Sequence, residues 1–221
     1  MMEKDLAPDL RAEVAALREQ VRRKSEELDE ALRETERLGR ELQAARANVR
    51  EQALRDPLTG LYNRHYVDDA LGRELVGALR IGRPLCVAFV AIDQFKAIQD
   101  LYGHAAGDEV LRVLGILLYR VCRENDILCR YGGEEFLLVM PGLGPESVGQ
   151  RIEQLRADVE AASIRHEASS IEVTASFGVA MFPGDGISPA ALIAAAENAL
   201  YVAKNSGRNR IVFHKVMPSE A

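Results

Sequence analysis

Two glycines and two glutamates lie side by side in residues 130–136, which read Arg-Tyr-Gly-Gly-Glu-Glu-Phe. Apolar runs flank this segment, so we expect the turn of a β-hairpin, with positive φ at both glycines. Glycines let a ligand approach the backbone closely, and carboxylates can hold a cation against phosphates. The pattern fits a metal-assisted phosphate site, and it fits an acidic surface hairpin equally well.

Further polar groups follow the apolar run 85–92, where residues 93–96 read Asp-Gln-Phe-Lys. A buried strand there would bring a carboxylate and a lysine to its exposed end, and a backbone turn would offer N–H groups to phosphate. Gln99 and Asp108 come next, and Asp108 by itself would need no role beyond capping a helix. Residues 204–210 gather cations around a glycine, which is also a common way for a helix to end.

The composition limits the classes of function. A net charge of -6 over 221 residues argues against a protein that coats a nucleic acid polymer, which would need a basic face. The apolar run 85–92 is too short for a membrane span, which needs about 20 residues, and the N-terminus does not resemble a signal peptide. Three cysteines without metal-ligand spacing suit a reducing compartment. We therefore expect a cytoplasmic protein without a membrane partner.

Residues 1–55 have the composition of a long helix, with a single proline and a single glycine. Apolar residues recur with a heptad period from Leu10 onward, interrupted by Lys24, Thr35 and Gln52. A lone surface helix would leave this stripe exposed to water, so we favour a coiled coil that forms a homodimer.

Pro57 and Gly60 end the helical pattern, and a different organisation follows. Helical and strand-like segments then alternate along the chain, which predicts an α+β fold with a central sheet flanked by helices. We expect a domain over residues 56–215 and a tail over 216–221. The expected elements are helices near 64–79, 108–121, 146–161 and 189–205, strands at 85–92, 172–181 and 211–214, and the hairpin around 130–136.

Taken together, five motifs resemble the GGDEF domain family, the diguanylate cyclases of bacterial signalling, in both order and spacing. These motifs are residues 56–64, 92–96, 103–108, 130–136 and 203–209. The resemblance implies a mostly antiparallel five-stranded central sheet after a long coiled-coil helix. It also implies that two GTP molecules, one on each of two facing domains, are joined into cyclic di-GMP with Mg²⁺ or Mn²⁺ as cofactor.

The resemblance also assigns roles to individual residues. Asp108 would read the guanine edge together with Gln99, and Gly132 would leave room for the nucleotide. Backbone N–H groups at the end of the first long strand would hold phosphates with the cations. The implied catalytic residues are Glu134, Glu135, Asp93 and Lys96; the metal ligands are Glu134, Ile92 and Asp93; and the substrate-binding residues are Gln94, Phe95, Lys96, Gln99, Asp108, Gly132, Lys204 and Arg208.

Two positions depart from the family pattern. Ala91 stands where the family usually has a metal-binding aspartate, and Gln99 replaces an asparagine. Loss of a carboxylate should weaken metal binding, although Asp93 is close enough to compensate. An alternative to an active cyclase is therefore a receptor that binds cyclic di-GMP or GTP without turnover.

Arg123 and Asp126 match the family's Arg-x-x-Asp site, at which the product cyclic di-GMP inhibits the enzyme. An arginine and an aspartate three positions apart are usually a simple exposed pair, so the place in the family pattern gives this motif its weight. The resemblance implies that Arg123 stacks on guanine or donates to it, and that Asp126 orders the arginine. Either Arg151 or Arg156 could assist.

Overall fold

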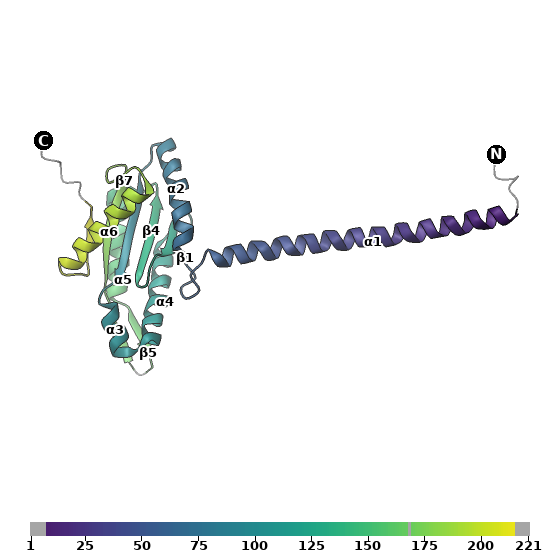
Figure 1. Cartoon of the computed structure of the whole chain (residues 1–221). Coiled ribbons are helices and arrows are strands. Elements are labelled where there is room, and N and C mark those ends of the chain that lie inside the picture. The colour runs from purple at the N-terminus through teal and green to yellow at the C-terminus, as the bar shows by residue number, and fades with distance from the viewer. Residues whose placement is uncertain (1–7, 168, 215–221) are drawn as a thin grey trace. The chain divides into compact units, whose positions relative to one another are not determined.

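A computed structural model describes residues 8–167 and 169–214 (Figure 1). The chain divides into two units, one ending at Ala53 and one beginning at Leu54. The described part of the first unit is a single helix, α1 (Pro8–Ala53). Its composition of alanine, leucine, glutamate and arginine accounts for the helix, because these residues have high helix propensity. The predicted tail, residues 216–221, lies outside the described residues.

The second unit is built on a mixed sheet of six strands. The strand order is β1-β3-β4-β2-β7-β8, with antiparallel pairs in the centre and a parallel pair at each edge. The predicted α+β class is confirmed, and the sheet has one strand more than the five expected because a two-residue strand joins one edge. The strands are β1 (Tyr62–Asn63), β2 (Leu85–Ile92), β3 (Ile127–Arg130), β4 (Glu135–Pro141), β7 (Ala175–Phe182) and β8 (Ile211–Phe213).

Helices cover both faces of this sheet, and α6 crosses in front of the strands in Figure 1. Apolar side chains of α2 and α6 pack on one face, and those of α4 and α5 pack on the other. Every residue of β2 is buried because the strand is central and covered on both sides. The helices of this unit are α2 (Arg64–Ile81), α3 (Phe95–Tyr102), α4 (His104–Val121), α5 (Pro145–Glu160) and α6 (Pro189–Asn205).

Three local expectations need correction. Helix α4 begins at His104, so Asp108 lies inside the helix and does not cap it. The short helix α3 occupies a stretch that we had not predicted to be helical. The single strand expected over 172–181 is two strands, because β6 (Ser169–Glu172) pairs with β5 (Ser163–His166) in a separate hairpin and β7 starts afterwards.

Side-chain caps and glycines set the ends of the long helices. Asn63 accepts a hydrogen bond from the Tyr66 N–H at the start of α2, and Ser188 accepts one from the Ala191 N–H at the start of α6. Gly82 ends α2 with a φ of 69°, a conformation that favours glycine. Within the described part of the chain, no helix combines the length and apolar composition needed to cross a bilayer.

Candidate nucleotide site

The end of β2 delivers Asp93 into a polar cage. Asp93 is only 6% exposed, and its carboxylate accepts hydrogen bonds from the hydroxyls of Ser176 and Thr174, both at 2.7 Å, and from the Asn209 backbone N–H at 3.0 Å. These donors come from β7, the segment just before it, and the loop after α6. Three of the roughly four acceptor sites on this carboxylate are already used, so at most one remains for a metal ion.

The backbone turns sharply after Asp93 and enters α3. Gln94 has a φ of 55°, which is unusual for a residue with a side chain. Among the described residues, no acceptor is found for the backbone N–H groups of Gln94, Phe95 and Lys96. Lys96 is exposed in the first turn of α3. Free N–H groups at a helix N-terminus beside a lysine form a favourable site for an anion such as phosphate.

The glycine hairpin between β3 and β4 differs from the predicted tight turn. The connection runs through four residues, 131–134, and neither Gly132 nor Gly133 has a positive φ. A loop of this length does not need the two-residue turn that requires left-handed glycines. Arg130 closes the loop from one side, because its guanidinium donates to the Gly133 carbonyl at 2.8 Å and also pairs with Asp56 at 3.2 Å.

The two glutamates of the hairpin have different partners. Glu135 lies opposite Ala91 in the sheet and approaches Lys204, with 3.7 Å between Oε1 and Nζ. Within the described residues, the Glu134 carboxylate has no hydrogen bond or ion pair, whereas its carbonyl accepts from the Ile92 N–H at 3.3 Å. Glu134 is therefore the hairpin carboxylate that remains available to a ligand.

The loop after α6 adds cations to the same end of the sheet. Gly207, Arg208 and Asn209 all have positive φ, at 116°, 61° and 47°. Arg208 is exposed, and no hydrogen bond or ion pair of its guanidinium is found among the described residues. Since Asn209 is tied to Asp93 and Lys204 to Glu135, this loop lies beside both β2 and the hairpin.

Helices α3 and α4 meet where the sequence predicts guanine recognition. A Cβ added at Gly107 would lie 2.8 Å from Cγ of Gln99 and 3.2 Å from the Phe95 ring, so the two helices are in close contact. Asp108 follows Gly107 directly and is half-buried. Gln99 therefore packs against α4 at Gly107, the residue that precedes Asp108.

The Arg-x-x-Asp motif forms a separate site at the end of α4. Asp126 has a side chain only 3% exposed, and one of its oxygens accepts from the Arg123 backbone N–H and from the Arg151 guanidinium. Arg123 itself is exposed, beside a cleft of about 500 Å³ that Tyr119 also lines. Arg156 instead bonds within α5 and to Asn209, so Arg151 is the arginine next to this motif.

The side chains at the end of β2 and in the hairpin offer a magnesium ion only some of the oxygen ligands it needs. Among the described residues, no group of three or more histidine, cysteine or acidic side chains is arranged to hold a metal. Ala91 has no side-chain donor atom, and three of the roughly four acceptor sites on the Asp93 carboxylate are already used. Magnesium often uses one or two carboxylates and completes its shell with waters and substrate phosphates. Glu134 fits one ion that is bound together with a nucleotide, but these residues do not fit two ions held by protein alone.

The residues that surround Asp93 have no specific signature in the sequence. Thr174, Ser176 and the backbone of Asn209 lie far from Asp93 along the chain, and hydroxyl residues in a strand carry no specific signal. The one available hint was the polar pair Thr174 and Ser176 at the start of an otherwise apolar strand.

The sequence pattern of the family described as "Diguanylate cyclase, GGDEF domain" matches residues 53–210. The chain is 38% identical over 162 residues to the diguanylate cyclase DgcP of Pseudomonas aeruginosa, and 39% identical over 164 residues to the response regulator PleD of Caulobacter vibrioides. Each match covers 73% of this chain. The matches span only 24% of DgcP and 36% of PleD, so these relatives are much longer proteins.

Solved structures show the same fold. The coiled coil and GGDEF domain of DgcB from Caulobacter crescentus, in complex with c-di-GMP, superposes with a TM-score of 0.79 at 30% identity, covering 84% of this chain and 98% of that one. The diguanylate cyclase SiaD of Pseudomonas aeruginosa, in complex with its activator SiaC, gives a TM-score of 0.71 at 32% identity, covering 92% of this chain and 78% of that one.

Proposed function

Because this chain belongs to the GGDEF domain family, we propose that it binds GTP at the end of β2 and joins two GTP molecules into cyclic di-GMP. The observation that carries the proposal is the set of free backbone N–H groups at residues 94–96. They lie at the same end of the sheet as the exposed side chains of Lys96 and Arg208 and the carboxylate of Glu134. A triphosphate supplies the negative charge that this arrangement lacks.

Each part of GTP has a matching group. Lys96 and Arg208 are exposed cations for the triphosphate, and Lys204 stands next to Glu135 at the same end of the sheet. Asp108 can accept hydrogen bonds from both N1–H and N2–H of guanine, which adenine does not offer in that arrangement. Gln99 supplies an amide on the neighbouring helix.

A Mg²⁺ or Mn²⁺ ion bound with GTP would neutralise phosphate charge and lower the pKa of the attacking hydroxyl. Glu134 is the residue we assign to hold it, with the Ile92 carbonyl as the backbone ligand that the family pattern implies. Ala91 removes one carboxylate from this set, so we expect weaker metal binding than in a member with aspartate there.

The reaction needs two chains. Each 3'-hydroxyl attacks the α-phosphate of the other GTP and releases pyrophosphate, so two sites must face each other. We propose that residues 1–55 form the coiled-coil stalk that pairs two domains of residues 56–215. The apolar stripe of α1, which includes Leu17, Leu28, Leu38 and Leu42, is exposed on a single chain and fits this role.

The pairing can be tested on the stalk itself. Inserting four residues after Gln43 shifts the heptad register and should alter the facing geometry of the two domains. We expect lower turnover or a changed oligomeric state by light scattering. Unchanged values of both would contradict the proposed stalk.

Arg123 and Asp126 support product inhibition. The exposed Arg123 borders the cleft at the end of α4, while Asp126 is held by Arg151. A guanidinium can stack on guanine and donate two parallel hydrogen bonds to its edge. We propose that cyclic di-GMP binds here and lowers the rate of its own synthesis.

A second candidate function is a receptor that binds cyclic di-GMP or GTP without turnover, and Ala91 is the observation that favours it. Incubating the purified chain with GTP and Mg²⁺ or Mn²⁺, and detecting cyclic di-GMP by mass spectrometry, separates the two. We expect product, and a loss of at least about 100-fold in Glu134→Gln. Glu167→Gln, in the β5–β6 hairpin, is the matched control. GTP binding without product would leave the receptor function.

A further inference from the structure

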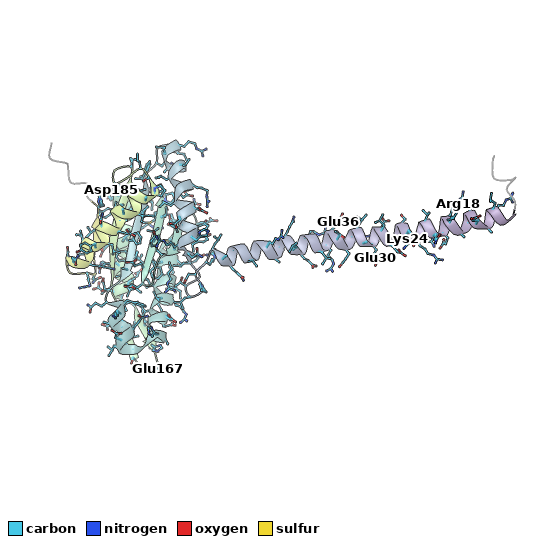
Figure 2. All side chains as sticks on the ribbon, viewed as in Figure 1. Arg18, Lys24, Glu30, Glu36, Glu167 and Asp185 are labelled. Atoms are coloured by element: carbon cyan, nitrogen blue, oxygen red, sulfur yellow. The ribbon has the colours of Figure 1, made fainter. Side chains whose placement is uncertain are left out.

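Left-handed backbone conformations gather around one buried carboxylate. Four non-glycine residues in the described part of the chain have positive φ, and three of them, Gln94, Arg208 and Asn209, lie on two segments next to Asp93. The fourth, Glu167, is in the β5–β6 hairpin, labelled in Figure 2. Side chains disfavour this conformation, so it persists only where surrounding contacts impose it.

Asp93 makes contacts that hold both the turn at Gln94 and the loop that contains Asn209. It precedes Gln94 directly, and its own N–H donates to the Thr174 carbonyl at 2.8 Å, which fixes the backbone at the start of the turn. Its carboxylate accepts the Asn209 N–H, and it is anchored by the hydroxyls of Thr174 and Ser176. One buried group therefore connects the turn before α3 to the loop after α6.

The side chain of Asn209 holds the second segment from the opposite side. Its Oδ1 accepts from the Arg156 guanidinium at 2.8 Å, and its Nδ2 donates to Glu160 at 2.8 Å. Asn209 thus lies between Asp93 and helix α5, next to the exposed Arg208. Both anchors therefore fix the loop at Asn209, directly after Arg208, whose guanidinium has no partner among the described residues.

We propose that Asp93 is a positioning residue, which holds the free N–H groups of residues 94–96 and the Arg208 loop in the geometry that receives one triphosphate, and that it is not a metal ligand. This inference rests on the proposed binding of GTP at these segments. The hydrogen bonds to Asp93 make a sharp distinction possible, because an amide can replace the carboxylate in this cage but is a poor substitute as a ligand for magnesium.

Asp93→Asn is the variant that separates the two roles. Its amide oxygen can accept from Asn209 and Thr174, and its NH₂ can donate to the Ser176 oxygen, since a hydroxyl can also accept. Asp93→Ala removes every acceptor. A positioning role predicts that asparagine rescues most of what alanine loses, whereas a metal-ligand role predicts similar losses in both variants.

The first measurement is hydrogen exchange on the full-length protein without nucleotide. In Asp93→Ala we expect the peptides covering residues 92–98 and 204–212 to exchange at least about 10-fold faster, because the anchoring contacts are lost. The β5–β6 peptide around Glu167 is the internal control and should stay within about 2-fold. Asp93→Asn should restore most of the protection. A uniform change over all peptides, or no rescue by asparagine, would overturn the inference.

The second measurement is the Kd of a non-hydrolysable GTP analogue, together with KM and kcat where turnover is found. We expect Asp93→Ala to raise Kd and KM at least about 10-fold, and Asp93→Asn to raise them less than about 3-fold. If the unmodified chain does not bind the analogue, the proposed function fails, and the exchange data still decide the structural role of Asp93.

Asn209 offers an independent check of the left-handed requirement. Asn209→Gly and Asn209→Ala both keep the N–H that bonds Asp93 and both lose the contacts to α5, but only glycine adopts positive φ without cost. Alanine should therefore weaken binding of the analogue at least about 3-fold more than glycine. Equal effects would contradict the role assigned to the backbone conformation.

Discussion

Asp56→Ala tests how the start of the second unit is anchored to the glycine hairpin between β3 and β4. The Asp56 carboxylate accepts hydrogen bonds from the N–H and hydroxyl of Thr59, at 2.8 and 2.7 Å, and pairs with Arg130. The side chains of Arg130 and Asp56 are only 18% and 16% exposed. The same guanidinium holds the Gly133 carbonyl, so the variant removes the partner that orients the hairpin arginine.

The magnitude follows from these contacts. Each hydrogen bond lost at Thr59 is worth about 1 kcal/mol, and the partly buried charge pair adds about 1 kcal/mol, so we expect a loss of about 3 kcal/mol. For a domain of this size, that corresponds to a fall in melting temperature of roughly 6–12 °C. Asp56→Asn keeps one acceptor for Thr59 and should lose about half as much.

Urea denaturation followed by circular dichroism, with the transition of the second unit analysed by itself, measures the effect. Glu109→Ala is the control, because its pair with Arg112 is well exposed and should be worth at most about 0.5 kcal/mol. The double variant Asp56→Ala/Arg130→Ala should show positive coupling between the two sites. A loss below about 1 kcal/mol in Asp56→Ala would refute the reasoning.

The same site predicts a dependence on pH. Burial alone would raise the pKa of Asp56, but the hydrogen bonds from Thr59 and the charge of Arg130 outweigh it and lower the pKa below its ordinary value of 3.8. A carboxyl whose pKa is lower in the folded than in the unfolded state stabilises the fold. This contribution is complete at a pH above the unfolded-state pKa, and it is lost as the pH falls through the folded-state pKa. The difference in stability between the natural chain and Asp56→Ala should therefore shrink below about pH 4.

Three further outcomes are expected. Ala91→Asp places a carboxylate at a fully buried position, so it should lower the free energy of unfolding by about 2 kcal/mol without metal. Mg²⁺ or Mn²⁺ should restore this stability, and the variant should turn over GTP faster. A melting temperature of the variant that does not change when metal is added would contradict this. Gly107→Ala should push Gln99 away from α4, cost about 1–2 kcal/mol and raise KM for GTP several-fold, which kinetics and urea denaturation will measure. Burial raises the pKa of the Cys129 thiol to about 12, so iodoacetamide should label this residue at pH 8 only after unfolding.

The elements that could be predicted from the sequence are those with strong and continuous local signals. Strand β2 has the predicted bounds because its eight residues are uniformly apolar and it is covered on both faces. Helix α6 also has its predicted bounds, because Pro189 fits the first helical position after the Ser188 cap. Helix α3 was missed because it is short and begins from the left-handed Gln94, which has no sequence signature.

The candidate site shows the same division. Charged residues in motifs, such as Glu134 and Arg208, could be named from the sequence because their type and spacing carry information. Their surroundings could not be named, because the partners of Asp93 lie 81, 83 and 116 positions away along the chain. The hairpin loop was predicted to be too tight, because Gly-Gly is compatible with both a two-residue and a four-residue connection.

The surroundings of Asp93, Glu134 and Glu135 explain why the alanine at position 91 should affect metal binding strongly. Asp93 is held by three donors and Glu135 lies beside Lys204, so a cation would compete with existing contacts of both side chains. Of these three carboxylates, Glu134 is the one without such a contact among the described residues. An aspartate at position 91 would lie opposite Glu135 in the sheet and add a second uncommitted carboxylate. We therefore expect an aspartate at position 91 to strengthen metal binding more than Asp93 can, because most acceptor sites of Asp93 are already used.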